Sequence, residues 1–164
     1  FDTPPHISDA GVAAIRSGQT RYTNVDGIPE LKDAIAAKFA RDNGLAYSRP
    51  QILVSSGAKQ TIYNLVTALL DPGDEAVIPA PYWVSYPDMV LLADGVPVTV
   101  YAGPEQGYKI TPAQLAAAIT PKTRLFILNS PSNPTGAAYT RAELQALGAV
   151  LAQHPRVVIA TDDM

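Results

Sequence analysis

The stretch of sequence that decides the fold is DPGDEAVIPAPYW, residues 71–83. Its first four residues have the composition of a tight turn, because Pro, Gly and Asp each favour turn geometries. The next five, 75–79, are mostly apolar and have the length of a short buried strand. A helical pattern then extends from Tyr82 to about Ala93. A strand bounded by a turn and a helix is the repeating unit of α/β domains.

The same alternation continues in both directions from this stretch. We predict further strands at residues 51–54, 96–101, 123–128 and 156–161. Helices are predicted at residues 57–70, from Thr111 onward, and from a capping box at Thr140 to about His154. Five short strands separated by helices predict an α/β fold with a mostly parallel sheet and helices on both faces.

The chain begins differently, which suggests two regions. Residues 1–28 form a turn-rich lead-in with one short helix near 10–17, capped by Ser8 or Asp9. Residues 29–164 form the α/β region, which opens with a helix from Pro29 to about Asn43 that Gly44 ends. The N-terminus has no signal-peptide pattern, and both ends look cut, so we expect a piece of a longer protein.

Composition excludes several classes of function. The net charge is −3 and no run of four basic residues occurs, so nucleic acid is not an expected partner. No apolar run is long enough for a membrane span. The chain has no cysteine, which removes disulfides and thiolate metal sites and is usual for cytosolic α/β enzymes. We therefore expect a cytoplasmic protein.

Parallel sheets bind ligands at the carboxyl ends of their strands, so the loops after residues 54, 79, 128 and 161 are the places to look. The first loop runs through small residues into a helix, around Gly57, Ala58 and Lys59. Free backbone N–H groups and the helix dipole make such a turn a phosphate cradle, although an ordinary strand-to-helix turn has the same composition. The second loop holds Trp83, which can stack on a planar ligand or simply pack beneath the loop.

The other two loops are polar. Residues 129–136 read NSPSNPTG, a rigid turn in which Asn amides offer both donors and acceptors. The last strand is followed by Asp162 and Asp163, of which only one is expected to face a site, because neighbouring residues of an extended chain point in opposite directions. A carboxylate there can pair with a cationic ligand atom, serve as an acid or base, bind a metal, or cap a helix.

The order and spacing of SSGAK (55–59), PYW (81–83), NSPSNPTG (129–136) and DDM (162–164) resemble the class I and II aminotransferases of fold type I. The bacterial aspartate and aromatic aminotransferases are the most similar subgroup. The resemblance covers essentially the whole chain and implies pyridoxal 5′-phosphate as the cofactor. It implies transfer of an amino group from an amino acid to a 2-oxo acid, in a homodimer.

The resemblance also implies residue roles. The backbone at Gly57, Ala58 and Lys59 would hold the cofactor phosphate, and Trp83 would stack on the pyridine ring and border the substrate. Asn133 would hydrogen-bond the 3-oxygen of the ring and orient the substrate carboxylate.

Two further roles come from the same resemblance. Asp162 would bind the pyridine nitrogen and keep it protonated. Tyr22, in a segment similar to the family's upstream Y-x-x-x-x-G pattern, would reach the phosphate in the neighbouring subunit.

The family's Schiff-base lysine falls beyond Met164, and none of the chain's own lysines stands in that context: Lys32, Lys38, Lys59, Lys109 and Lys122. We therefore expect this chain to be inactive by itself. Two alternatives stay open at this point. One is a fold type I lyase of the C–S or aminocyclopropane-carboxylate type, and the other is a non-catalytic α/β module that binds a phosphorylated ligand.

Overall fold

The computed structural model describes residues 1–163 and divides into two compact units, Phe1–Ser55 and Ser56–Met164. We call them the N-terminal unit and the sheet unit. The sequence predicted a boundary after residue 28, between a lead-in segment and the α/β region. That boundary does not describe compact units, and it stays a prediction.

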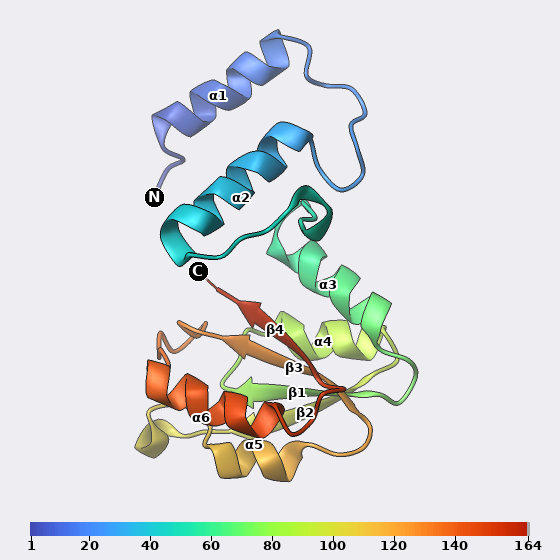
Figure 1. Ribbon diagram of the computed structural model, residues 1–164, viewed down its shortest axis with the longest axis vertical. Coiled ribbons are helices and arrows are strands. Elements are labelled where there is room, and N and C mark those ends of the chain that lie inside the picture. The colour runs from blue at the N-terminus through green and yellow to red at the C-terminus, as the bar shows by residue number, and fades with distance from the viewer. Residues whose placement is uncertain (164) are drawn as a thin grey trace. The chain divides into compact units, whose positions relative to one another are not determined.

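The N-terminal unit is built from two helices and a short 3-10 turn: α1 (Pro5–Arg16), α2 (Pro29–Asn43) and η1 (Arg49–Gln51) (Figure 1). Helix α2 confirms the prediction, since Pro29 occupies its first turn and Gly44 closes it with φ +67°. Helix α1 begins earlier than predicted. Pro4 and Pro5 set its start, so neither Ser8 nor Asp9 is its cap.

The predicted strand at residues 51–54 was wrong. Gln51 belongs to η1, where the side chains of Ser48 and Gln51 form a capping box. The amide of Val54 donates to Asp26 O at 3.1 Å, within the N-terminal unit. A strand exists only as part of a ladder with a neighbour, and this segment joins none among residues 1–163.

The sheet unit begins with helix α3 (Ala58–Leu69) and alternates strands with helices from there. Its strands are β1 (Glu75–Ala80), β2 (Val96–Tyr101), β3 (Thr123–Asn129) and β4 (Val158–Asp162). Between them lie α4 (Ser85–Leu92), η2 (Pro104–Gln106), α5 (Pro112–Ala118) and α6 (Arg141–Leu151). The strands form one sheet in the order β2-β1-β3-β4, and every pairing is parallel, as predicted.

Helices cover both faces of this sheet, which also confirms the prediction (Figure 1). Successive residues of a strand point to opposite faces. Ile78 and Ile127 accordingly pack against α3 and α4, whereas Val77 and Phe126 pack against α5 and α6. The two central strands, β1 and β3, therefore carry both halves of the core.

Most helices and strands begin and end within a few residues of their predicted positions. The side chains of Thr111 and Thr140 cap α5 and α6 in complete capping boxes. Helix α4 begins at Ser85 rather than at Tyr82, and β4 begins at Val158 rather than at residue 156. Strand β4 lies at the end of the sheet, and its Val158 and Ile159 are 40% and 50% exposed.

Candidate functional site

The strand order creates a switch point between β1 and β3. The chain leaves β1 through α4 toward β2 on one side, and it leaves β3 through α6 toward β4 on the other side. In open parallel sheets, this arrangement leaves a crevice at the carboxyl ends of the two strands. A hollow lies there, and its lining includes Tyr82 and Tyr86 after β1 and Asn129 and Ser132 at and after the end of β3.

Asp162 ends β4 at this edge and is held by Tyr86. Tyr86 lies in the first turn of α4 and is only 2% exposed. Its hydroxyl donates a hydrogen bond to Oδ2 of Asp162. Burial of the ring, followed by this hydrogen bond, raises the pKa of the Tyr86 hydroxyl. The Tyr86 hydroxyl therefore stays protonated and donates this hydrogen bond, which the Asp162 carboxylate accepts.

Asn129 connects Asp162 to the loop after β3. Its Nδ2 donates to the carbonyl oxygen of Asp162 at 2.7 Å, and its Oδ1 accepts from the amide of Asn133 at 2.6 Å. One side chain thus fixes the backbone at two of the predicted site residues. Neither Asn129 nor Tyr86 had an individual role predicted from the sequence, although Asn129 lies in the NSPSNPTG motif and Tyr86 follows the PYW motif by three residues.

Trp83 lies beside this group of residues. Its ring is half-buried and meets the ring of Tyr86 edge to face, with centroids 5.3 Å apart and planes at 79°. The ammonium group of Lys59 lies 5.0 Å from the Trp83 ring centroid, within the range of a cation–π contact. The loop after β1 and the start of α3 are therefore in direct contact.

The start of α3 has the form predicted for an anion site. Gly57 precedes the helix with φ +89° and ψ 160°, and no side chain caps the helix. The first amides of a helix have no partner within it, so those of Ala58, Lys59 and Gln60 are available to an anion. Ala58 and Asp162 line the same depression, of about 240 Å³. The helix start and the end of β4 thus border one space.

Contacts therefore connect four of the predicted residues of the sheet unit: Lys59, Trp83, Asp162 and Asn133. They run from Lys59 through Trp83, Tyr86 and Asp162 to Asn129 and Asn133. Asp163 is exposed whereas Asp162 is half-buried, in line with the alternation of an extended chain. The roles of these residues remain predictions.

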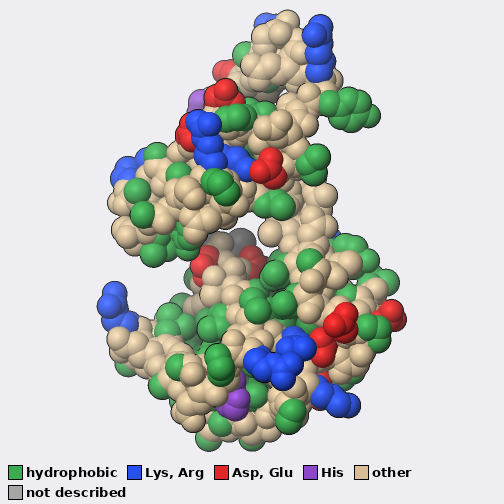
Figure 2. All heavy atoms as spheres, turned by 45° about the vertical axis from the view of Figure 1, so that its right-hand side comes forward, with side chains coloured by type: hydrophobic (Ala, Val, Ile, Leu, Met, Phe, Trp, Pro, Cys, Tyr) green, Lys and Arg blue, Asp and Glu red, His purple; other side chains and the backbone are tan. Residues whose placement is uncertain are grey.

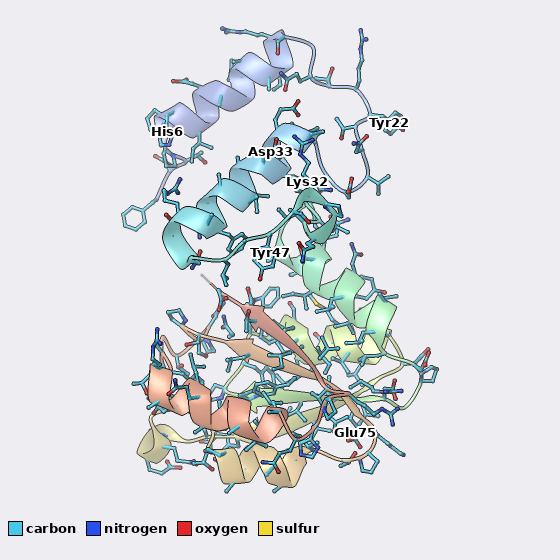
Figure 3. All side chains as sticks on the ribbon, in the orientation of Figure 1. His6, Tyr22, Lys32, Asp33, Tyr47 and Glu75 are labelled. Atoms are coloured by element: carbon cyan, nitrogen blue, oxygen red, sulfur yellow. The ribbon has the colours of Figure 1, made fainter. Side chains whose placement is uncertain are left out.

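Tyr22 belongs to the N-terminal unit, on the loop between α1 and α2 (Figure 3). It is fully exposed, and its predicted contact with a second subunit remains a prediction.

Acidic and basic side chains are interspersed on the face shown in Figure 2. Within residues 1–163, no cluster of three or more His, Cys, Asp or Glu has the arrangement of a metal site. Within the same residues, no helix has the length and apolarity needed to cross a bilayer.

The site joins a free helix start, an aromatic ring, an amide-rich turn and a carboxylate at the ligand edge of a parallel sheet. This set fits a flat, phosphorylated ligand with a basic ring nitrogen, and the fold that carries it is an α/β domain with a parallel sheet. Over residues 1–164 the chain matches the family model described as aminotransferase class I and II. The chain belongs to this family. The aromatic ring of Trp83 and the carboxylate of Asp162 are groups that fit pyridoxal phosphate, and their roles toward it are predictions.

Individual relatives agree with the family. The chain is 65% identical to an aspartate/prephenate aminotransferase of Cereibacter sphaeroides and 60% identical to one of Nitrosomonas europaea, in each case over the whole chain and 41% of the relative. The crystal structure of the aspartate aminotransferase from Rhizobium meliloti superposes with a TM-score of 0.96 at 51% identity, covering 99% of this chain and 40% of that one. The aromatic aminotransferase of Pyrococcus horikoshii gives a TM-score of 0.95 at 36% identity, covering 100% and 44%.

Proposed function

We propose that this chain is the cofactor-holding part of a pyridoxal-phosphate-dependent aminotransferase, which transfers an amino group from an amino acid to a 2-oxo acid. The observation that carries the proposal is the unbroken set of contacts from Lys59 to Asn133 around Asp162. The activity of the whole protein is part of the proposal, since the chain spans 41% of the length of the relatives named above.

Each residue of the site has one task in this proposal. The amides of Ala58 and Lys59 bind the cofactor phosphate, because a helix start without a side-chain cap attracts an anion. The Trp83 ring covers one face of the pyridine, and Asn133 holds the ring oxygen. Asp162 binds the protonated ring nitrogen. When bound, pyridoxal phosphate supplies an electron sink for the substrate carbon that loses its proton.

The substrates, the assembly and the location are finer parts of the proposal. Two relatives at 60% identity or more are named for aspartate and prephenate, and we extend this pair to the present chain. A homodimer in which Tyr22 serves the partner's phosphate site is proposed from the resemblance of the segment around Tyr22 to the family pattern. A cytoplasmic location is proposed from the cysteine-free sequence.

A titration with pyridoxamine 5′-phosphate tests the proposal in the chain itself. This cofactor form has no aldehyde and cannot form imines with surface lysines. Trp83 is the single tryptophan, so quenching of its fluorescence reports binding at the site. We expect saturable quenching in the unsubstituted chain.

Asp162→Asn and Asp163→Asn form a matched pair of variants. Loss of a hydrogen bond to a charged group costs about 1.5–3 kcal/mol, so Asp162→Asn should weaken binding about 10- to 100-fold. Asp163→Asn should leave the affinity unchanged, because this side chain is exposed. Equal affinities of the two variants would contradict the proposed site. In the protein that carries this chain, amino transfer from aspartate separates an aminotransferase from a lyase or a non-catalytic module.

A further inference from the structure

We infer that Tyr86 is a positioning residue, whose hydroxyl fixes the Asp162 carboxylate so that its second oxygen faces the ring nitrogen of the cofactor. This inference rests on the proposed function and adds a residue that the sequence motifs did not assign.

The Tyr86 ring is held firmly by the core. It packs in the cluster that joins α3, α4 and the sheet, together with Val66, Val90 and Ile78. A buried side chain in such a cluster keeps one rotamer, because close packing leaves no room for another. The hydroxyl therefore has a fixed place, and the hydrogen bond to Oδ2 of Asp162 starts from a rigid base.

Asp162 is held at two points. Tyr86 binds its carboxylate, and Asn129 binds its main-chain carbonyl at 2.7 Å. Restraint at both points leaves the side chain little freedom to rotate. The Oδ1 oxygen receives no hydrogen bond from the described residues, so it is the one available to a ligand.

The chemistry of the partner also matters. Tyr86 is a neutral donor, so it orients the carboxylate without cancelling its negative charge. No ion pair joins Asp162 to a cation of the described sheet unit. The charge is thus kept for a cationic ring nitrogen. A Lys or Arg in place of Tyr86 would neutralise this charge.

Tyr86→Phe distinguishes the effect of the hydroxyl from the effect of the ring. Phe keeps the edge-to-face contact with Trp83 and the core packing, and it removes only the bond to Asp162. Tyr139→Phe is the matched control, because Tyr139 is half-buried and its hydroxyl oxygen accepts a bond from the amide of Ile110 at 2.9 Å. Both variants lose one hydroxyl, but only Tyr86→Phe alters Asp162.

The experiment is a double-mutant cycle of Tyr86→Phe and Asp162→Asn in the 164-residue chain, with two readouts. The first is affinity for pyridoxamine 5′-phosphate by Trp83 fluorescence, and the second is the urea midpoint. We expect Tyr86→Phe to weaken binding about three- to tenfold, the loss typical of one hydrogen bond. In the Asp162→Asn background the same change should alter binding by less than about twofold, because the shared interaction is already lost. Tyr139→Phe should lower the urea midpoint and leave the affinity unchanged.

The inference would be overturned if Tyr86→Phe and Asp162→Asn reduced the affinity independently, so that their fold-losses multiplied in the double mutant. It would also be overturned if Tyr139→Phe lost as much affinity as Tyr86→Phe. If Asp162→Asn binds as tightly as the unsubstituted chain, or if that chain shows no saturable quenching, the proposed function fails instead. The urea cycle then decides the inference alone. If the changes in urea midpoint caused by the two substitutions are not additive, Tyr86 positions Asp162. If the changes are additive, the inference is wrong.

Discussion

Replacement of Gly57 by alanine tests how the start of α3 is made ready for an anion. The backbone of Gly57 has φ +89° and ψ 160°, a region in which essentially only glycine is found. A Cβ built at this position meets no atom within 4 Å, so the substitution introduces no clash. Its whole cost is therefore backbone strain, about 1–3 kcal/mol.

Gly148→Ala is the matched control. Gly148 lies inside α6 of the same unit, and a Cβ there also meets nothing within 4 Å. Both changes reduce the freedom of the unfolded chain equally, which stabilises by about 0.4–1 kcal/mol. Gly57→Ala should therefore lose about 0.5–2 kcal/mol net, whereas Gly148→Ala should gain about 0.5–1 kcal/mol in a helix interior.

Two measurements check this expectation. Urea unfolding followed by Trp83 fluorescence gives the stability of the sheet unit in each variant. Binding of pyridoxamine 5′-phosphate should weaken in Gly57→Ala because the first amides of α3 turn away from the phosphate, while binding of phosphate-free pyridoxamine should not change. If Gly57→Ala matched Gly148→Ala in both stability and phosphate-dependent affinity, the strained turn would have no part in the site.

Substitutions at three further positions test the sheet unit. Phe126→Ala should cost about 3–5 kcal/mol in urea unfolding, because Phe126 is 1% exposed in the centre of β3; a loss below about 1 kcal/mol would contradict its place in the core. Thr140→Ala should cost about 0.5–2 kcal/mol through loss of the α6 cap, and Thr140→Ser should restore most of it. The hydrogen bond from Lys109 lowers the pKa of Glu143 from 4.5 to about 2, so its contribution to stability is complete above pH 4.5 and is lost as the pH falls toward 2. Glu143→Gln should therefore flatten the decline of the thermal midpoint between pH 4.5 and 2. An unchanged decline would show that the Lys109–Glu143 pair does not contribute to stability.

Local signals in the sequence predicted the parallel sheet well. The turn before β1, the predicted helix start at Thr111, the capping box at Thr140 and Gly44 after α2 each act within a few residues, so the local sequence carries the information. Residues 51–54 failed for the opposite reason. Their apolar pattern is that of a strand, but a strand needs a neighbour, and sequence does not reveal which neighbours the chain provides.

The candidate site shows the same difference between local signals, which the sequence reveals, and long-range contacts, which it does not. Position at a strand end pointed to the loops that hold Trp83, Asn133 and Asp162, and the resemblance to the aminotransferases singled out these residues within them. The hydrogen bonds that join them were out of reach, because Tyr86 and Asp162 are 76 residues apart and meet only through the strand order. An aromatic residue in a helix reads as a core residue by sequence, and Tyr86 is indeed part of the core as well as a donor.

Among residues 1–163, strand β4 pairs only with β3, and Val158 and Ile159 are 40% and 50% exposed. A row of free backbone groups beside apolar side chains is a template for strands from other molecules. Concentrated solutions of this chain should therefore form edge-to-edge oligomers in a time-dependent way. A lysine introduced at Val158 should suppress that growth, because a charge on an edge strand repels incoming copies.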